Sequence, residues 1–320
     1  MTAQALNLRH VLLLTVPPLL WAGNAVTGRL MVGLVPPITL NALRWLLVLV
    51  LLLPLGWPAL ATPAARRQVI ERWKPLALLG LVGVGSYNAL QYMALTTSTP
   101  LNITLIAAAS PLCMMVVGAL FYGQRPSRRG LAGAALSLVG VAAVLTRGDL
   151  RALSSVQFVA GDLLMLPAMA SWAFYSWMLA RPAPSMRGAQ RPAWDATAFL
   201  LLQTIFGLAW AGAAAAAEMM VVPDRIHWTA GTMLAMAYIA IGPSIAAYLC
   251  WGRGVAAVGP ATAAFFVNLT PLFAALLQAV LLGEPPRPYH AAAFVLIVGG
   301  IVVSSSRPRG SAGADQKVPG

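Results

Sequence analysis

The sequence predicts an all-α integral membrane protein, with ten transmembrane helices arranged as two inverted five-helix repeats. Three observations predict this fold: apolar stretches as long as a membrane is thick, a one-sided distribution of basic residues, and an internal repeat. Charged residues make up 9% of the chain and hydrophobic residues 59%, whereas soluble domains carry about 25% charge. In lipid the backbone must satisfy its own hydrogen bonds, and long apolar runs do so as helices.

Ten apolar stretches fill nearly the whole chain, and each has the length of about 20 residues that a helix needs to cross a bilayer core. They begin near Val11, Ile38, Pro75, Pro100, Leu131, Ala160, Ala196, Thr232, Ala261 and Ala291. The connectors between them are short. We therefore expect the lipid bilayer as a partner and no large soluble domain.

The basic residues fall mainly on one side of these stretches. If the N-terminus is cytoplasmic, 15 of the 21 Lys and Arg residues lie on the cytoplasmic side and 5 on the far side, with Arg44 inside a span. Cytoplasmic connectors of membrane proteins carry this excess of positive charge. The distribution predicts a multi-pass protein of the plasma (inner) membrane with both termini in the cytoplasm. It also accounts for the net charge of +13 without nucleic-acid binding.

An internal repeat divides the chain into residues 1–150 and 151–306, followed by a polar tail, 307–320, that is expected to be a disordered cytoplasmic segment. Residues 94–144 align without a gap on residues 254–304, and the coinciding positions include prolines and glycines, which shape the backbone. These pairs are Pro100 and Pro260, Pro111 and Pro271, Gly123 and Gly283, Pro126 and Pro286, and Gly140 and Gly300. Each half holds five spans, an odd number, so the second half is expected to be inverted. The alternative is a chance likeness between apolar sequences.

Prolines interrupt the predicted spans at corresponding places of the two halves. Paired interruptions are the best sequence indication of a binding site at the middle of the membrane, because a proline frees a backbone carbonyl. The alternative is a simple packing kink, which is common in membrane helices. The predicted hinge or kink residues are Pro17, Pro18, Pro111, Pro167, Pro243 and Pro271.

Arg44 lies about eight residues into the second span, where a charge costs at least about 2.5 kcal/mol on insertion. Two interpretations remain open. In the functional one, Arg44 is the counter-charge for a substrate carboxylate. In the structural one, it binds freed backbone carbonyls or extends to the membrane interface.

Neutral polar and aromatic side chains recur in the spans of both halves. Such groups suit a small polar or zwitterionic molecule with an apolar part, although hydrogen bonds between helices would explain them one by one. In the third span Tyr87, Asn88 and Gln91 share one helix face, which favours a cavity. The predicted substrate-binding residues are Trp21, Asn24, Asn41, Arg44, Tyr87, Asn88, Gln91, Trp172, Tyr175, Tyr248 and Asn268.

Several functions are excluded or disfavoured by what the sequence lacks. It has no GxxxxGK[ST] loop, no HExxH and no GxSxG motif, so we expect no enzyme activity, no cofactor and no metal. Its acidic residues lie at span ends or in connectors, so no proton relay is visible, which favours facilitated diffusion or exchange. Small residues dominate spans five and ten and predict peripheral packing or a dimer surface, so a monomer or a homodimer is expected.

Five stretches, taken in order and spacing, resemble the drug/metabolite transporter superfamily, in particular its EamA-type ten-helix permeases. They are WAGN (Trp21–Asn24), the run ending at Arg44, Pro111 followed by Gly123, GDLLMLPAMASWAFY (Gly161–Tyr175), and LTPL…LLGE (Leu269–Glu284). The resemblance implies alternating access through a central cavity between spans 1–4 and 6–9, and export of amino acids, drugs or other metabolites. Gln124 stands where the second half has Glu284, which departs from the family pattern.

The expected function is transport of small amphipathic metabolites, amino-acid-like and in the export direction, by alternating access. The direction comes from the family resemblance alone. The alternative is a multidrug efflux carrier for lipophilic or cationic compounds, which would need a carboxylate in the cavity, whereas Arg44 carries the opposite charge. A lipid-modifying membrane enzyme would need clustered acids or histidines, which the sequence lacks.

Overall fold

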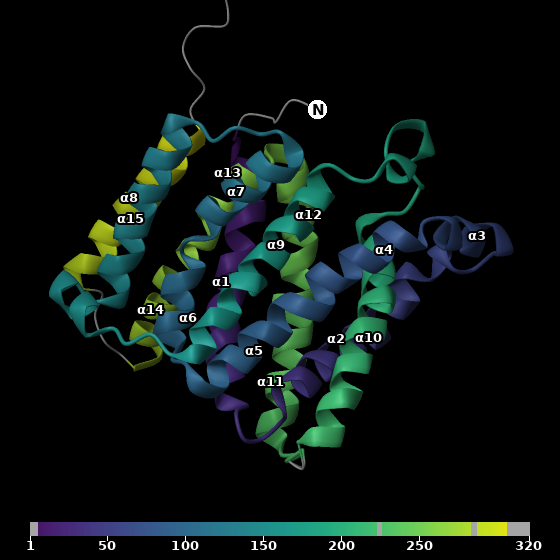
Figure 1. The fold of residues 1–320 in the computed structure, drawn as a ribbon, viewed down its shortest axis with the longest axis horizontal. Helices are drawn as coiled ribbons and strands as arrows, with labels where there is room; N and C mark the ends of the chain where they lie inside the picture. The colour runs from purple at the N-terminus through teal and green to yellow at the C-terminus, as the bar shows by residue number, and fades with distance from the viewer. Residues whose placement is uncertain (1–5, 223–225, 283–286, 306–320) are drawn as a thin grey trace, which may run out of the picture.

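The computed structural model describes residues 6–222, 226–282 and 287–305, with side chains left undescribed at 278–282. This part of the chain is a bundle of helices (Figure 1). The first half contains α1 (Leu8–Leu30), α2 (Pro37–Gly56), α3 (Pro63–Glu71), α4 (Trp73–Gly80), η2 (Leu81–Ser86), α5 (Tyr87–Thr97), α6 (Pro100–Ala107), α7 (Ser110–Tyr122) and α8 (Arg128–Leu145). The second half contains η4 (Ala160–Leu164), α9 (Met165–Ala180), α10 (Ala196–Val221), α11 (Ala230–Ile239), η7 (Ala240–Ala246), α12 (Ala247–Val258), α13 (Pro260–Val267), α14 (Leu269–Leu282) and α15 (Pro288–Ser305).

Eight helical runs in the described part are long and apolar enough to cross a membrane, or nine if α6 and α7, which meet at 42°, form one bent span. The chain is therefore a multi-pass integral membrane protein. The sequence predicted ten spans, and the one missing from this set begins near Pro75. Residues 73–97 are helical throughout as α4, η2 and α5, but Asn88 and Gln91 lower the hydropathy of this run.

The two halves share their sequence of elements. Two π-helical segments, η2 and η7, occupy equivalent places, and α6, α7 and α8 correspond to α13, α14 and α15. Pro100 and Pro260, which the repeat aligned, are both the first residues of their helices. The aligned residues Gly283 and Pro286, the motif end at Glu284 and the tail 307–320 lie outside the described residues.

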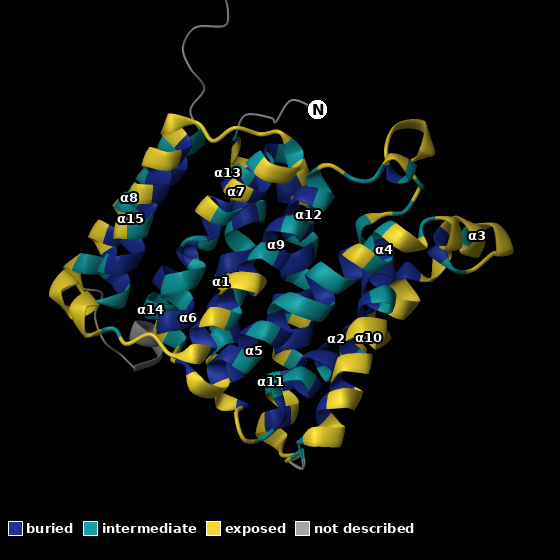
Figure 2. Cartoon of the chain, viewed as in Figure 1, coloured by how far each residue is buried: buried dark blue, intermediate teal, exposed yellow. Residues whose placement is uncertain are grey.

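Equivalent helices of the two halves also pack against each other: α2 against α10, and α8 against α15. Gly133 of α8 and Gly300 of α15 make the second contact possible. A Cβ atom on either glycine would come within 2.6 Å of the other's carbonyl oxygen. The small residues of spans five and ten therefore bring these two helices together at one edge of the bundle, and exposed residues lie on the outer side of the pair (Figure 2).

The predicted kink prolines lie in different local settings. Pro111, Pro167 and Pro271 fall in the first turns of α7, α9 and α14, where a proline costs no hydrogen bond. Pro243 lies inside the π-helical segment η7. The helix α1 continues through Pro17 and Pro18 without a break. Next to these prolines α1 packs closely on α12. Leu14 of α1 fills the space that a side chain at Gly254 of α12 would take. The role of these prolines as hinges stays a prediction.

Candidate transport cavity

A cavity lies among α1, α5, α6, α9, α12 and the α13–α14 junction, and we call it the central cavity. It leaves about 60 Å³ in which the centre of a water molecule can lie, enough for several waters. Eight of the eleven predicted site residues line it: Trp21, Asn24, Tyr87, Asn88, Gln91, Trp172, Tyr248 and Asn268. Asn41, Arg44 and Tyr175 lie behind this lining. Their roles in substrate binding stay predictions.

Breaks between helices place polar groups at the cavity. The break between α6 and α7 brings Ser110 to the wall, and the equivalent break between α13 and α14 brings Asn268 and Thr270. The Nδ2 of Asn268 donates to the Oγ of Ser137 at 2.9 Å. The Oδ1 of Asn268 and the Oγ1 of Thr270 are buried with no hydrogen-bond partner among the described residues. Both oxygens can accept a hydrogen bond from a bound molecule.

Aromatic rings form one wall of the cavity. Trp21 of α1 meets Trp172 of α9 edge to face, with ring centroids 5.2 Å apart. In the sequence, Pro17, Trp21 and Ala22 of the first half resemble Pro167, Trp172 and Ala173 of the second half with a one-residue shift, so the two tryptophans occupy similar places in the two halves. Trp172 also contacts Tyr87 at 5.4 Å and Trp251 at 5.4 Å between centroids. Aromatic pairs of this geometry add about 0.5–1.5 kcal/mol each beyond the burial of their area, so the wall is a rigid apolar surface.

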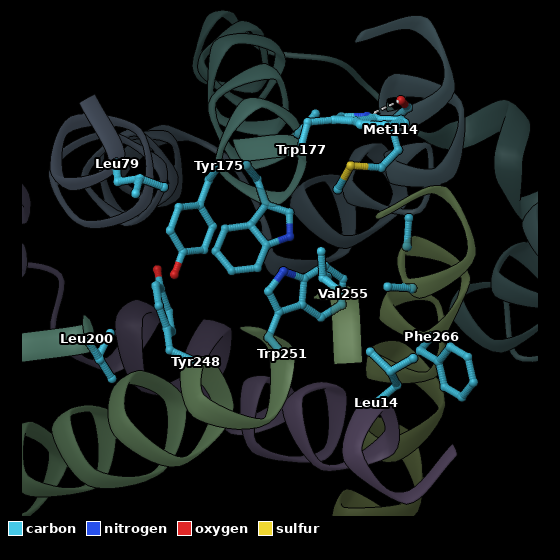
Figure 3. Close-up of a cluster of buried hydrophobic side chains, with 14 of the residues drawn as sticks. Leu14, Leu79, Met114, Tyr175, Trp177, Leu200, Tyr248, Trp251, Val255 and Phe266 are labelled. Carbon is cyan, nitrogen blue, oxygen red and sulfur yellow. Dashed lines mark hydrogen bonds between the residues drawn. The ribbon is translucent and has the colours of Figure 1, made fainter. Parts of the chain in front are cut away.

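This aromatic wall continues into the buried core behind the cavity. Tyr175 of α9 and Tyr248 of α12 face each other there, next to Trp251 (Figure 3). The hydroxyl of Tyr248 donates to the carbonyl oxygen of Gly83 at 2.6 Å, and the Nε1 of Trp251 donates to the Oγ of Ser176 at 3.1 Å. The first bond ties the second half of the chain to the first, and the second joins α12 to α9 within the second half.

Arg44 is fully buried on α2, and neutral side chains hold its guanidinium group. Its Nε donates to the Oγ of Ser244 in η7, and its Nη1 donates to the hydroxyl of Tyr92 at 2.9 Å and to the Oδ1 of Asn24 at 3.5 Å. The hydroxyl of Tyr92 in turn donates to Asn24 Oδ1 at 3.0 Å. The Cζ of Arg44 lies 5.5 Å from the ring centroid of Trp45.

This buried cation has no acidic partner among the described side chains, whose salt bridges all involve Glu71 on the surface. The Nη2 of Arg44 is buried without a hydrogen-bond partner in that part of the chain. The structural interpretation of Arg44 expected its charge to meet freed backbone carbonyls or to extend to the membrane interface. The contacts do not include a backbone carbonyl, and complete burial leaves no route to the membrane interface.

The π-helical segments explain several of the other polar residues. A π turn leaves carbonyl groups without their usual partners, and neighbouring side chains supply donors. The Nδ2 of Asn41 donates to the carbonyl oxygen of Val84 at 3.0 Å, and the Nε1 of Trp21 donates to that of Pro243 at 3.0 Å. Asn41 thus has a structural partner that explains its burial, although its Oδ1 remains without one among the described residues.

Sequence reasoning missed part of the cavity wall. The additional lining residues are Ala25, Ile103, Thr104, Ala107, Ala108, Ser110, Val267 and Thr270, and Pro271, which was predicted as a kink residue, lines the cavity as well. The repeat held a signal for two of them, because Ser110 and Thr270 are equivalent positions next to the aligned prolines. The small and aliphatic residues carry no such signal. Within the described chain, no group of three His, Cys, Asp or Glu side chains could hold a metal ion.

Comparison with known proteins decides the family. The profile of the EamA-like transporter family matches twice, at residues 8–146 and 159–306. The chain belongs to the EamA-like transporter family. It is thus a membrane transporter built from two EamA domains, and the family is not one of enzymes. The two matched segments correspond to the two helical halves, as expected for a duplicated unit.

Relatives named as transporters cover nearly the whole chain. An uncharacterized transporter of Archaeoglobus fulgidus is 27% identical over 94% of this chain and 99% of its own length. A Salmonella typhimurium protein named "Probable amino-acid metabolite efflux pump" is 28% identical over 89% and 90%. An aromatic amino acid exporter of Ancylobacter novellus is 25% identical over 90% and 93%. One solved crystal structure shares the fold, with a TM-score of 0.69, 24% identity and coverage of 92% of this chain and 96% of that chain.

Proposed function

We propose that this EamA-family transporter exports small amphipathic metabolites that resemble amino acids, and that they bind in the central cavity. The observation that carries the proposal is the buried guanidinium of Arg44, one side chain behind the cavity wall and without an acidic partner among the described residues. A buried charge without a counter-charge is costly. A substrate carboxylate would lower that cost each time it binds.

The rest of the cavity supports the same ligand chemistry. The aromatic wall around Trp21 and Trp172 fits an apolar side chain. The free acceptor oxygens of Asn268 and Thr270 fit an ammonium group. Distant relatives named as exporters of amino acids or their metabolites point the same way, and the export direction rests on them.

For the mechanism we propose ten spans in two inverted halves, with alternating access to the cavity and both termini in the cytoplasm of the inner membrane. The equivalent packing of α2 with α10 and of α8 with α15 supports a two-fold relation between the halves. Transport is facilitated diffusion or exchange, because no acidic residue lines the central cavity in the described chain. Residues such as Gly83 and Pro243, in the two π-helical segments, supply the bending points.

A counterflow assay in proteoliposomes tests this function. Vesicles holding the full chain are loaded with unlabelled L-phenylalanine, and uptake of labelled L-phenylalanine is measured. Phenethylamine, which keeps the ring and the amine but lacks the carboxylate, is the matched competitor. We expect phenylalanine to exchange and phenethylamine to compete weakly. Strong competition by phenethylamine and by quaternary amines, without amino acid exchange, would instead identify a carrier of lipophilic cations.

A further inference from the structure

A second cavity lies beside the connector between α1 and α2. This connector is at the end of the bundle where α1 ends (Figure 1). We call this second cavity the connector cavity. It leaves about 270 Å³ for the centre of a water molecule, against about 60 Å³ in the central cavity. Its walls include Gly28, Met31, Leu40 and Tyr92, which are apolar apart from the tyrosine hydroxyl. Nothing described so far uses this space.

The two cavities are separated by the side chains that hold Arg44. Asn24 lines the central cavity and Tyr92 lines the connector cavity. The two are joined by the hydrogen bond from the Tyr92 hydroxyl to Asn24 Oδ1, and both accept from the Nη1 of Arg44. Side chains therefore form this partition. Neither side chain is acidic, so each contact that it makes can be exchanged at the cost of one hydrogen bond.

The Tyr92 ring lies on a glycine of the neighbouring helix. A Cβ atom on Gly28 would come within 2.8 Å of the Tyr92 Cε1, and Gly28 lines the connector cavity as well. The absence of a side chain at position 28 lets the ring reach across toward Asn24 of the same helix α1. It also leaves open space on the connector side of the ring, where the connector cavity lies.

Arg44 is within reach of a ligand in either cavity once this partition opens. Its Nη2 has no hydrogen-bond partner among the described residues, and Nη1 and Nη2 together match the two oxygens of a carboxylate. A carboxylate that displaces the Tyr92 hydroxyl from Nη1 would bind the same guanidinium from the connector side. The charge can therefore stay paired as the ligand passes.

We propose that the connector cavity is a second binding site for the carboxylate-bearing substrate, and that Tyr92 is the gate between it and the central cavity. The substrate passes the gate with its carboxylate bound to Arg44. Its apolar part leaves the aromatic wall of the central cavity and packs against Met31 and Leu40 in the connector cavity. This inference rests on the proposed function, because it requires a substrate with a carboxylate.

A thiol-protection experiment tests the second site. Met31→Cys is made in the full chain with Cys113→Ala and Cys250→Ala, reconstituted, and labelled with a membrane-impermeant maleimide applied to each face in turn. Leu30→Cys, at the adjacent, exposed position outside the cavity, is the matched control. We expect L-phenylalanine at ten times its dissociation constant to slow labelling of Met31→Cys about tenfold and to leave Leu30→Cys unchanged. Phenethylamine is expected to protect neither.

The gate is tested separately by the exchange rate. Tyr92→Phe keeps the ring but removes the hydroxyl that binds Asn24 and Arg44, so we expect phenylalanine exchange to accelerate about threefold to tenfold. Gly212→Ala, where a Cβ atom would meet nothing within 4 Å, should leave the rate unchanged. Normal exchange with no protection of Met31→Cys would overturn the second site, and an unchanged or slower Tyr92→Phe would overturn the gate. Absence of phenylalanine exchange in the wild type would instead count against the proposed function.

Discussion

Replacing Arg44 by glutamine should separate a role in binding from a role in folding. The guanidinium donates three hydrogen bonds, to Ser244, Tyr92 and Asn24. A hydrogen bond from a charged group contributes about 1.5–3 kcal/mol, so their loss costs about 4 to 9 kcal/mol. The substitution also removes the buried unpaired charge, and with it a desolvation cost of several kcal/mol to the folded state. The two nearly cancel, and we expect a shift in Tm of less than about 5 °C.

The effect of Arg44→Gln on substrate binding should be much larger. Loss of one charged hydrogen bond to a carboxylate, at about 1.5–3 kcal/mol, corresponds to an affinity lower by about 10- to 150-fold. The assay is phenylalanine counterflow for KM, with thermal unfolding of the purified protein beside it. Arg253→Gln, at an exposed cation on α12, is the matched control. An unchanged KM would refute the carboxylate role, and a collapse of Tm would show that Arg44 chiefly stabilises the fold.

Three further variants have expected outcomes. Gly300→Ala should lower the unfolding free energy by about 1–3 kcal/mol in thermal denaturation, because its Cβ meets the Gly133 carbonyl. Asp162→Ala should lower the unfolding free energy by about 3 kcal/mol, because Asn102 and the Val159 amide lose their acceptor. An unchanged Tm would show that water replaces the Asp162 carboxylate as acceptor. Tyr87→Phe should leave Tm unchanged, because the Tyr87 hydroxyl bonds to no described residue. It should raise KM for phenylalanine about fivefold in counterflow, because the hydroxyl can bond to the substrate. An equal KM would remove Tyr87 from the site.

Features that depend on one helix at a time could be predicted from the sequence. The apolar runs located the eight or nine spans that the described chain shows, and Tyr87, Asn88 and Gln91 share a helix face that does line the central cavity. The likeness of the two halves around Trp21 and Trp172 was visible in the sequence, and the two rings are in contact in the structure. The third span, predicted from near Pro75, is not among the candidate spans of the described chain, because Asn88 and Gln91 lower the hydropathy of this helical run.

Contacts between distant segments could not be predicted in the same way. Arg44 binds Ser244, which is 200 residues away, and no sequence pattern gives the rotation of α2 relative to η7. The place of Tyr92 between two cavities depends on the close approach of its ring to Gly28, which no sequence pattern gives. The π-helical segments were equally hidden. Pro243 was predicted as a kink residue, but the sequence does not say which side chain donates to its carbonyl oxygen.

The most direct test of the account is a crystal structure of the full chain with p-bromophenylalanine, located by anomalous scattering from bromine. The account expects the bromine against the aromatic wall formed by Trp21 and Trp172, and the carboxylate within hydrogen-bond distance of Arg44 or Asn24. Bromine only at the outer surface, or in the central cavity with the carboxylate turned away from Arg44, would contradict it.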